Sequence, residues 1–78
     1  MDYQKKILEL LQQRDLGKTI CPSEVLPAEL KQDPLIMEEV RNSARALALK
    51  GMIEITQKGK VVDPHNFRGP IRLRLRRQ

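Results

Sequence analysis

The 78-residue sequence is poor in the side chains that build covalent, metal and aromatic sites: it has one Cys, one His, one Tyr, one Phe and no Trp. A single Cys cannot form an internal disulfide, and one Cys with one His falls short of the ligands that a structural zinc site needs. With so few aromatic rings, the core must be built mainly from aliphatic side chains. We therefore expect one small domain over residues 1–78 that uses no metal and no cofactor.

Long hydrophobic runs are missing as well. No apolar stretch approaches the roughly 20 residues that a membrane-spanning helix needs. The first residues, MDYQKKILELL, carry charged and amide side chains where a signal peptide needs an apolar segment. The sequence therefore predicts a cytoplasmic protein without a membrane partner.

The sequence also lacks recognisable catalytic patterns. It contains no pair of nucleophile and base, no carboxylate pair, no phosphate-binding glycine loop and no metal-ligand spacing. We therefore expect a protein without enzymatic activity.

The net charge of +5 is distributed unevenly along the chain. Residues 1–40 carry five basic and eight acidic side chains, a net charge of −3, whereas residues 41–78 carry ten basic and two acidic ones, a net charge of +8. This asymmetry is typical of a face that contacts a polyanion such as a nucleic acid. The alternative is a solubilising basic tail, because the last seven residues hold four of these charges, on Arg72, Arg74, Arg76 and Arg77.

Residues 33–57 carry the strongest structural signals. Asp33 can cap a helix with its side-chain oxygen, Pro34 fits the first helical position, and Gly51 can end the helix in a left-handed conformation. Apolar residues spaced by three and four form one face of this helix: Met37, Val40, Ala44 and Leu47. The pattern predicts a helix over residues 34–50, then strands over 52–57 and 60–62 joined by a turn with positive φ at Gly59.

Shorter elements surround this region. A first helix is predicted over residues 3–14, with an apolar face formed by Tyr3, Ile7, Leu10 and Leu11. A short second helix is predicted over residues 22–30, with Pro22 in its first turn and Pro27 breaking its hydrogen-bond ladder. Strands are expected at 18–20 and 71–75, before a basic end at 76–78. This order predicts an α+β fold, a winged helix-turn-helix with three helices and a small antiparallel β-sheet.

Cys21 and His65 are the two residues with reactive side chains that need an interpretation. Cys21 sits at the predicted cap of the second helix, where Glu24 can reach back to it and where a thiol can become activated. No basic partner is recognisable beside Cys21, so a structural role is favoured over a redox one. His65 lies in a loop over residues 63–70, where we expect an exposed or locally hydrogen-bonded side chain. Phe67, the only large apolar residue of that loop, is expected to hold it against the core.

Basic residues of the hairpin and of the last strand are the first candidate contacts for a nucleic acid. Lys58 and Lys60 lie at the predicted hairpin tip. Arg72, Arg74 and Arg76 alternate with apolar residues, which places their side chains on one face about 7 Å apart, near the spacing of phosphates along a strand.

The outward face of the long helix supplies the other candidates. Asn42 lies nearly opposite the apolar stripe with Arg45 beside it, and Arg41 lies on the flank; all three can contact bases or phosphates. However, Glu38 on the same face repels phosphate, and Arg41 can instead pair with an acid such as Glu24. The leading hypothesis is a DNA-binding module, with duplex DNA favoured over RNA.

A second hypothesis follows from this sparse polar surface. The same helix face is expected to expose an apolar group of residues, Leu35, Ala46 and Leu49. Such a patch is typical of a protein contact, so the domain can alternatively be an adaptor that binds a protein partner. Whether the domain forms a homodimer stays open.

Several short segments resemble one family of small bacterial domains. They are IleCysProSerGluVal at 20–25, ValArg at 40–41, AlaArg at 44–45, IleThrGlnLysGly at 55–59, ValAspPro at 62–64 and GlyProIleArgLeuArg at 69–74. Together they resemble DUF3253, a family of unknown function, over about residues 19–75. The resemblance implies a winged-helix-like fold, and it brings no known activity and no established binding residues. At 33–34 this chain has AspPro where members of the family often carry TrpArg.

Overall fold

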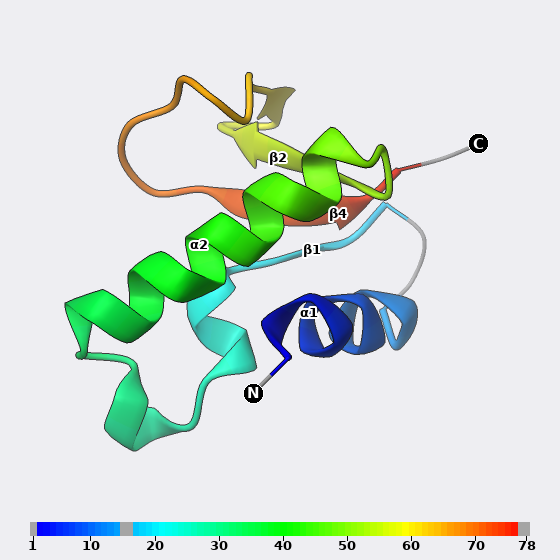
Figure 1. Ribbon diagram of the computed structural model, residues 1–78. Helices are drawn as coiled ribbons and strands as arrows, with labels where there is room; N and C mark the ends of the chain where they lie inside the picture. The colour runs from blue at the N-terminus through cyan, green and yellow to red at the C-terminus, as the bar shows by residue number, and fades with distance from the viewer. Residues whose placement is uncertain (1, 15–16, 77–78) are drawn as a thin grey trace.

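Two helices cover one face of a small antiparallel β-sheet in the computed structural model, which describes residues 2–14 and 17–76 (Figure 1). The helices are α1 (Tyr3–Gln12) and α2 (Pro34–Leu49). The strands are β1 (Thr19–Ile20), β2 (Ile53–Gln57), β3 (Lys60–Val61) and β4 (Arg72–Leu75). The fold is therefore mixed α+β, as the sequence predicts. Of the predicted basic end at 76–78, only Arg76 lies among the described residues.

Helix α2 begins and ends as its sequence predicts. The Asp33 carboxylate accepts hydrogen bonds from the backbone N–H groups of Leu35, at 3.0 Å, and Ile36, at 3.4 Å. Gly51 follows the helix with a φ of +78°, and the N–H of Met52 donates to the carbonyl of Leu47 at 3.0 Å. This is the usual glycine ending of a helix, and it turns the chain directly into β2.

The second helix predicted over residues 22–30 is not an α-helix, although the predicted break at Pro27 is present. This segment forms two 3₁₀ turns, η1 (Pro22–Val25) and η2 (Ala28–Leu30), so the described residues hold two α-helices rather than three. Leu26 between them is extended, with φ −110° and ψ 144°. The following residue, Pro27, explains the break, because a proline disfavours helical geometry in the residue before it and lacks an N–H of its own.

The sheet has the strand order β1-β4-β2-β3, and every neighbouring pair is antiparallel. Leu73 of β4 lies opposite Ile20 of β1 and Ile55 of β2, which gives an apolar row on the face toward the helices. Arg74 lies opposite Thr19 and Glu54, and this polar row belongs to the other face. Each strand lies within one residue of its predicted bounds.

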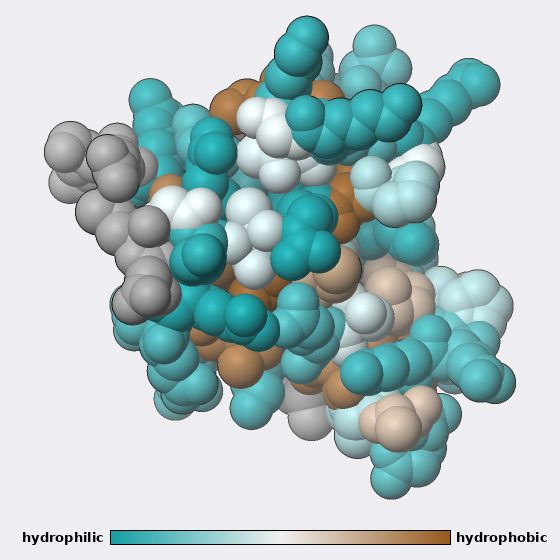
Figure 2. Space-filling view, turned by 180° about the vertical axis from the view of Figure 1, so that it is seen from behind, coloured by the Kyte–Doolittle hydropathy of each residue, from teal (hydrophilic) through white to brown (hydrophobic). Residues whose placement is uncertain are grey.

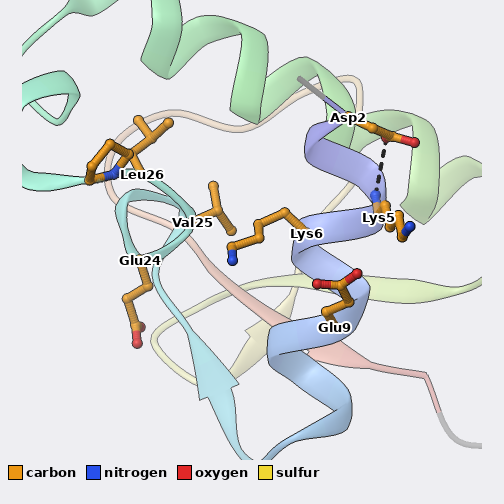
Figure 3. Close-up of a pocket in the computed structure, with 8 residues that line it drawn as sticks. Asp2, Lys5, Lys6, Glu9, Glu24, Val25 and Leu26 are labelled. Atoms are coloured by element: carbon orange, nitrogen blue, oxygen red, sulfur yellow. Dashed lines mark hydrogen bonds between the residues drawn. The ribbon is translucent and has the colours of Figure 1, made fainter.

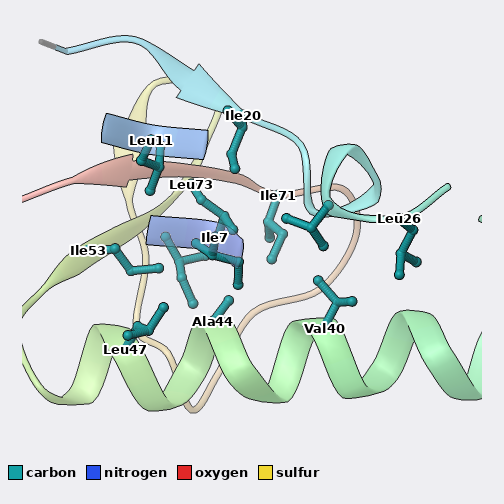
Figure 4. Packing of buried hydrophobic residues seen from close by; sticks show 12 residues of the cluster. Ile7, Leu11, Ile20, Leu26, Val40, Ala44, Leu47, Ile53, Ile71 and Leu73 are labelled. Atoms are coloured by element: carbon teal, nitrogen blue, oxygen red, sulfur yellow. The ribbon is translucent and has the colours of Figure 1, made fainter. Parts of the chain in front are cut away.

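The core between the helices and the sheet is aliphatic, as expected (Figure 4). Its buried residues are Ile7 and Leu11 of α1, Val40, Ala44 and Leu47 of α2, Ile20, Ile53, Ile55, Ile71 and Leu73 of the sheet region, and Val25 and Leu26. The predicted phase of α2 is confirmed, because Val40, Ala44 and Leu47 are buried while the side chains of Leu35 and Leu49 lie outside. Leu35 is 78% exposed and Leu49 58%.

Candidate nucleic-acid interface

The outward face of α2 is organised around one carboxylate, that of Glu38. Its Oε1 lies 2.9 Å from Nη1 of Arg45, and its Oε2 lies 3.7 Å from Nη1 of Arg41. Nη1 of Arg45 also donates to Oδ1 of Asn42 at 2.5 Å. The three residues that the sequence places on this helix as nucleic-acid contacts therefore do come together, but their polar groups are directed at Glu38 and at one another.

Arg45 has a second partner outside the helix. Its guanidinium carbon lies 4.8 Å from the centroid of the Phe67 ring, within the range of a cation–π contact. Phe67 is half-buried and packs against the core, so the prediction that it holds its loop there is confirmed. Arg45 thus joins α2 to the loop between β3 and β4.

Arg41 pairs with an acid, as the sequence allows, but the acid is Glu38 rather than Glu24. Glu24 is engaged elsewhere: its Oε1 lies 2.5 Å from Nη2 of Arg14, and its Oε2 accepts from the backbone N–H of Cys21 at 2.6 Å. The hydrogen bond to Cys21 is the capping contact that the sequence predicts. Because η1 holds Glu24 close to α1, Arg41 finds its partner on its own helix, one turn earlier.

The alternating pattern places Arg72, Arg74 and Arg76 in one row, but these three arginines differ in their partners. Arg74 pairs with Glu54 of the neighbouring strand, and its Nη2 and Nε lie 2.7 Å and 3.0 Å from the same oxygen, Oε1. Arg72 instead bonds to neutral groups. Its Nε donates to Oγ1 of Thr19 at 2.5 Å, and its Nη2 donates to the Thr19 carbonyl at 3.3 Å. Among the described residues no carboxylate pairs with Arg72 or Arg76.

Cys21 has a basic neighbour that the sequence did not reveal. Nη1 of Arg72 lies 3.0 Å from Sγ of Cys21. The expectation that no basic group stands beside this thiol is therefore wrong. The reason is the pairing of β1 with β4, which brings the two distant segments together.

At His65 the backbone N–H donates to Oδ1 of Asp63 at 2.9 Å, and the residue is exposed, as predicted.

The hairpin tip presents two lysines to solvent. Lys58 and Gly59 both have positive φ, +52° and +81°, and they connect the paired residues Gln57 and Lys60. Positive φ at both central residues is the turn geometry that fits the twist of a two-residue hairpin. Lys58 and Lys60 are exposed, and within the described part of the chain neither forms an ion pair.

Sequence reasoning missed one basic residue of this region, Arg68. It lies in the loop before β4, where no periodic pattern fixes the direction of a side chain. In the structure Arg68 lines a cavity of about 570 Å³ together with Lys58 and Arg72. Figure 2 shows the molecule from behind the view of Figure 1, and hydrophilic side chains cover most of this face.

A second cavity, of about 580 Å³, lies between α1 and the η1 turn (Figure 3). Figure 3 shows side chains of both charge signs around it, among them Lys5, Lys6, Glu9 and Glu24. Such a mixed lining gives no preference for a ligand of one charge sign, so the hairpin side is the better candidate for an anion. Over residues 2–14 and 17–76 no three His, Cys, Asp or Glu side chains gather to hold a metal ion.

The described helices include none that is long and apolar enough to span a membrane. A comparison with curated proteins found no match to this chain. A family model described as "Protein of unknown function (DUF3253)" matches residues 1–76, which extends the resemblance of residues 19–75 to include the first helix. The chain therefore belongs to the DUF3253 family.

Proposed function

We propose that the domain is a winged-helix module that binds duplex DNA and has no enzymatic activity. The order of elements supports this: a helix, a strand, a helical turn region, a long helix and a hairpin, with β4 between β1 and β2. In this scheme η1 and η2 take the place of the second helix, α2 is the third helix, and the β2–β3 hairpin with the following loop forms the wing.

The observation that carries the proposal is the position of the cations that lack acidic partners. Ten Lys and Arg side chains of the described residues are exposed and form no ion pair, and five of them follow β2 in the chain: Lys58, Lys60, Arg68, Arg72 and Arg76. These five belong to the hairpin, the loop before β4, and β4 with the residue after it. Unpaired cations can neutralise backbone phosphates and release counterions, which is the main source of sequence-independent affinity for DNA.

The long helix has a smaller part in this proposal than in a sequence-specific regulator. Glu38 neutralises the cations beside it and repels phosphate, and Asn42 already accepts a hydrogen bond from Arg45. Binding that depends on backbone phosphates should therefore vary little between DNA sequences.

The experiment is fluorescence anisotropy of the wild-type protein on a mixed-sequence duplex at several salt concentrations. We expect binding at low salt that weakens steeply as salt rises. A dissociation constant weaker than about 100 μM at low salt, below ordinary non-specific association, would rule the proposal out.

A second candidate function, a protein-interaction domain, is favoured by the apolar residues on α2. Leu35 and Leu49 are 78% and 58% exposed, and Ala46 on the same helix is half-buried. Because Glu38 pairs with the arginines beside it, this face carries little net charge that would oppose contact with a protein partner or a second copy of the chain. Elution from heparin or DNA-cellulose with rising salt separates the two functions, because a DNA-binding protein is retained and an adaptor much less so.

A further inference from the structure

We propose that the cavity beside the β2–β3 hairpin is a binding site for a phosphate group. The cavity has a volume of about 570 Å³. It is lined by the end of β2, the hairpin tip, the loop before β4, the start of β4 and the residue after β1. Its polar lining comes from Cys21, Thr56, Gln57, Lys58, Arg68 and Arg72.

The first reason is the charge of the lining. Three cations, Lys58, Arg68 and Arg72, line the cavity, and no carboxylate of the described residues does. Carboxylates line four other cavities: Glu24 lies in the one between α1 and η1, Glu9 in the one between α1 and α2, and Glu54 in two beside β2. The hairpin cavity therefore favours an anion, and a phosphate group carries up to two negative charges.

The second reason is that Arg72 is fixed before any ligand arrives. Its guanidinium donates to Oγ1 and the carbonyl of Thr19 and to Sγ of Cys21. A guanidinium has five N–H groups in one plane, so two remain for a ligand after these three bonds. One of them is on Nη1 and the other on Nη2, and each can donate to a phosphate oxygen; because Arg72 is already held, little side-chain freedom is lost on binding.

The third reason is that the wall carrying Arg68 is tied to the hairpin. The side-chain amide nitrogen of Gln57 donates to the carbonyl of Pro70 at 3.1 Å and also to the carbonyl of Arg68. Oγ1 of Thr56, which is only 2% exposed, donates to the carbonyl of Arg72 at 3.3 Å. These bonds hold the loop beside the strand, so Arg68 and Arg72 line one cavity with Lys58.

The phosphate can have two sources, a small phosphate ester or the backbone of a nucleic acid. Both offer the same oxygens to the three cations. The inference therefore goes beyond the proposed function and does not depend on it, because the cavity can take a phosphate that belongs to no nucleic acid.

The test is an NMR titration of the ¹⁵N-labelled protein with inorganic phosphate, at constant ionic strength against chloride. The cavity variant is Lys58→Gln with Arg68→Gln. The matched control is Lys60→Gln with Arg76→Gln, which removes the same charge from residues that do not line the cavity. Unchanged thermal melting of both variants shows that they fold.

We expect saturable shifts of the backbone signals of Gln57, Arg68 and Arg72 in the wild type and in the control. In the cavity variant the affinity should fall by at least about tenfold, the effect of losing one charge-assisted hydrogen bond. Shifts that do not saturate by tens of millimolar phosphate, or that are equal in both variants, overturn the proposal.

A second arm identifies the source by adding adenosine 5′-monophosphate or a mixed-sequence duplex to the wild type. If the duplex shifts the cavity signals and inorganic phosphate competes with it, the site takes a backbone phosphate. If adenosine 5′-monophosphate shifts the cavity signals and the duplex does not, the site takes a small ester. Phosphate binding without any duplex binding supports the phosphate site and refutes the proposed function. Duplex binding without phosphate saturation supports the proposed function and refutes the phosphate site.

Discussion

The guanidinium of Arg45 stacks over the ring of Phe67, 4.8 Å from its centroid, while the same side chain pairs with Glu38. One residue of α2 therefore contacts both its own helix and the loop between β3 and β4. Sequence periodicity assigns the guanidinium of Arg45 to ligand contact. In the structure the same group also packs against the ring of Phe67. Its availability to a nucleic acid is lower than its position on the helix indicates.

The contact leads to a prediction for Phe67. Phe67→Ala removes the half-buried ring, its packing against the core and the cation–π contact, so we expect a loss of about 2 kcal/mol in the free energy of unfolding. Phe67→Leu keeps most of the apolar packing and should lose about 0.5 to 1 kcal/mol. Urea denaturation measures both. A change below about 0.5 kcal/mol for Phe67→Ala would show that the ring does not hold the loop.

Two leucines of α2 test the orientation of the helix. Leu47 is 1% exposed and Leu49 58% exposed. Leu47→Ala should therefore lower the free energy of unfolding by about 2 to 4 kcal/mol, through lost burial and the cavity left behind. Leu49→Ala should change it by less than about 1 kcal/mol. If denaturation ranks Leu49→Ala as the costlier change, the two faces of α2 have been assigned the wrong way round.

Local sequence specifies α2 and the longer strands but not the region 22–30. The start of α2 was predictable because Asp33 and Pro34 act on the backbone next to them, and Gly51 acts on the helix end in the same way. Strands β2 and β4 were predictable because apolar residues alternate along them. The region 22–30 was not, because two competing effects meet there. Pro22 favours a helical start, but Pro27 disfavours helical geometry at Leu26 and prevents the turns from joining.

The partners of the basic residues were beyond local sequence for a different reason. Arg74 meets Glu54, and Arg72 meets Cys21, only because the register of the sheet aligns residues that are far apart in the chain. Arg68 lies in a loop whose course is set by bonds to the side chain of Gln57. Alternation could place the arginines of β4 on one face of the sheet, but it could not show which of them was already neutralised.

The Arg74–Glu54 pair leads to a prediction about charge. Glu54→Gln removes the carboxylate and frees Arg74, so we expect tighter binding to duplex DNA at low salt and a slope of log K against log salt that steepens by about 0.9. The stability cost should be about 1 kcal/mol or less, since both side chains are partly exposed. The control is Glu9→Gln on α1, which changes the net charge equally. Equal gains in both variants would mean that net charge alone, and not Arg74, is responsible.

Asn42→Ala tests whether α2 enters a groove. Because Oδ1 of Asn42 already accepts from Arg45 and Glu38 stands beside them, we expect the relative affinities for several duplexes of different sequence to stay the same. A loss of direct base contact would instead alter discrimination by about 1 to 3 kcal/mol. Competition anisotropy with an unlabelled set of duplexes measures this. A clear change in sequence preference would show that α2 enters a groove and contacts bases.

The hairpin lysines provide the most direct test of DNA binding. Lys58 and Lys60 are exposed and, within residues 2–14 and 17–76, form no ion pair. Lys58→Gln with Lys60→Gln should weaken binding to all sequences alike and reduce the steepness of log K against log salt by about 2, because each phosphate contact contributes roughly 0.9. The control, Lys5→Gln with Lys6→Gln, removes the same charge from exposed positions of α1. Anisotropy on a mixed-sequence duplex at several salt concentrations compares the three proteins. If the α1 variant loses as much slope as the hairpin variant, the attraction comes from net charge and the hairpin is not the contact surface.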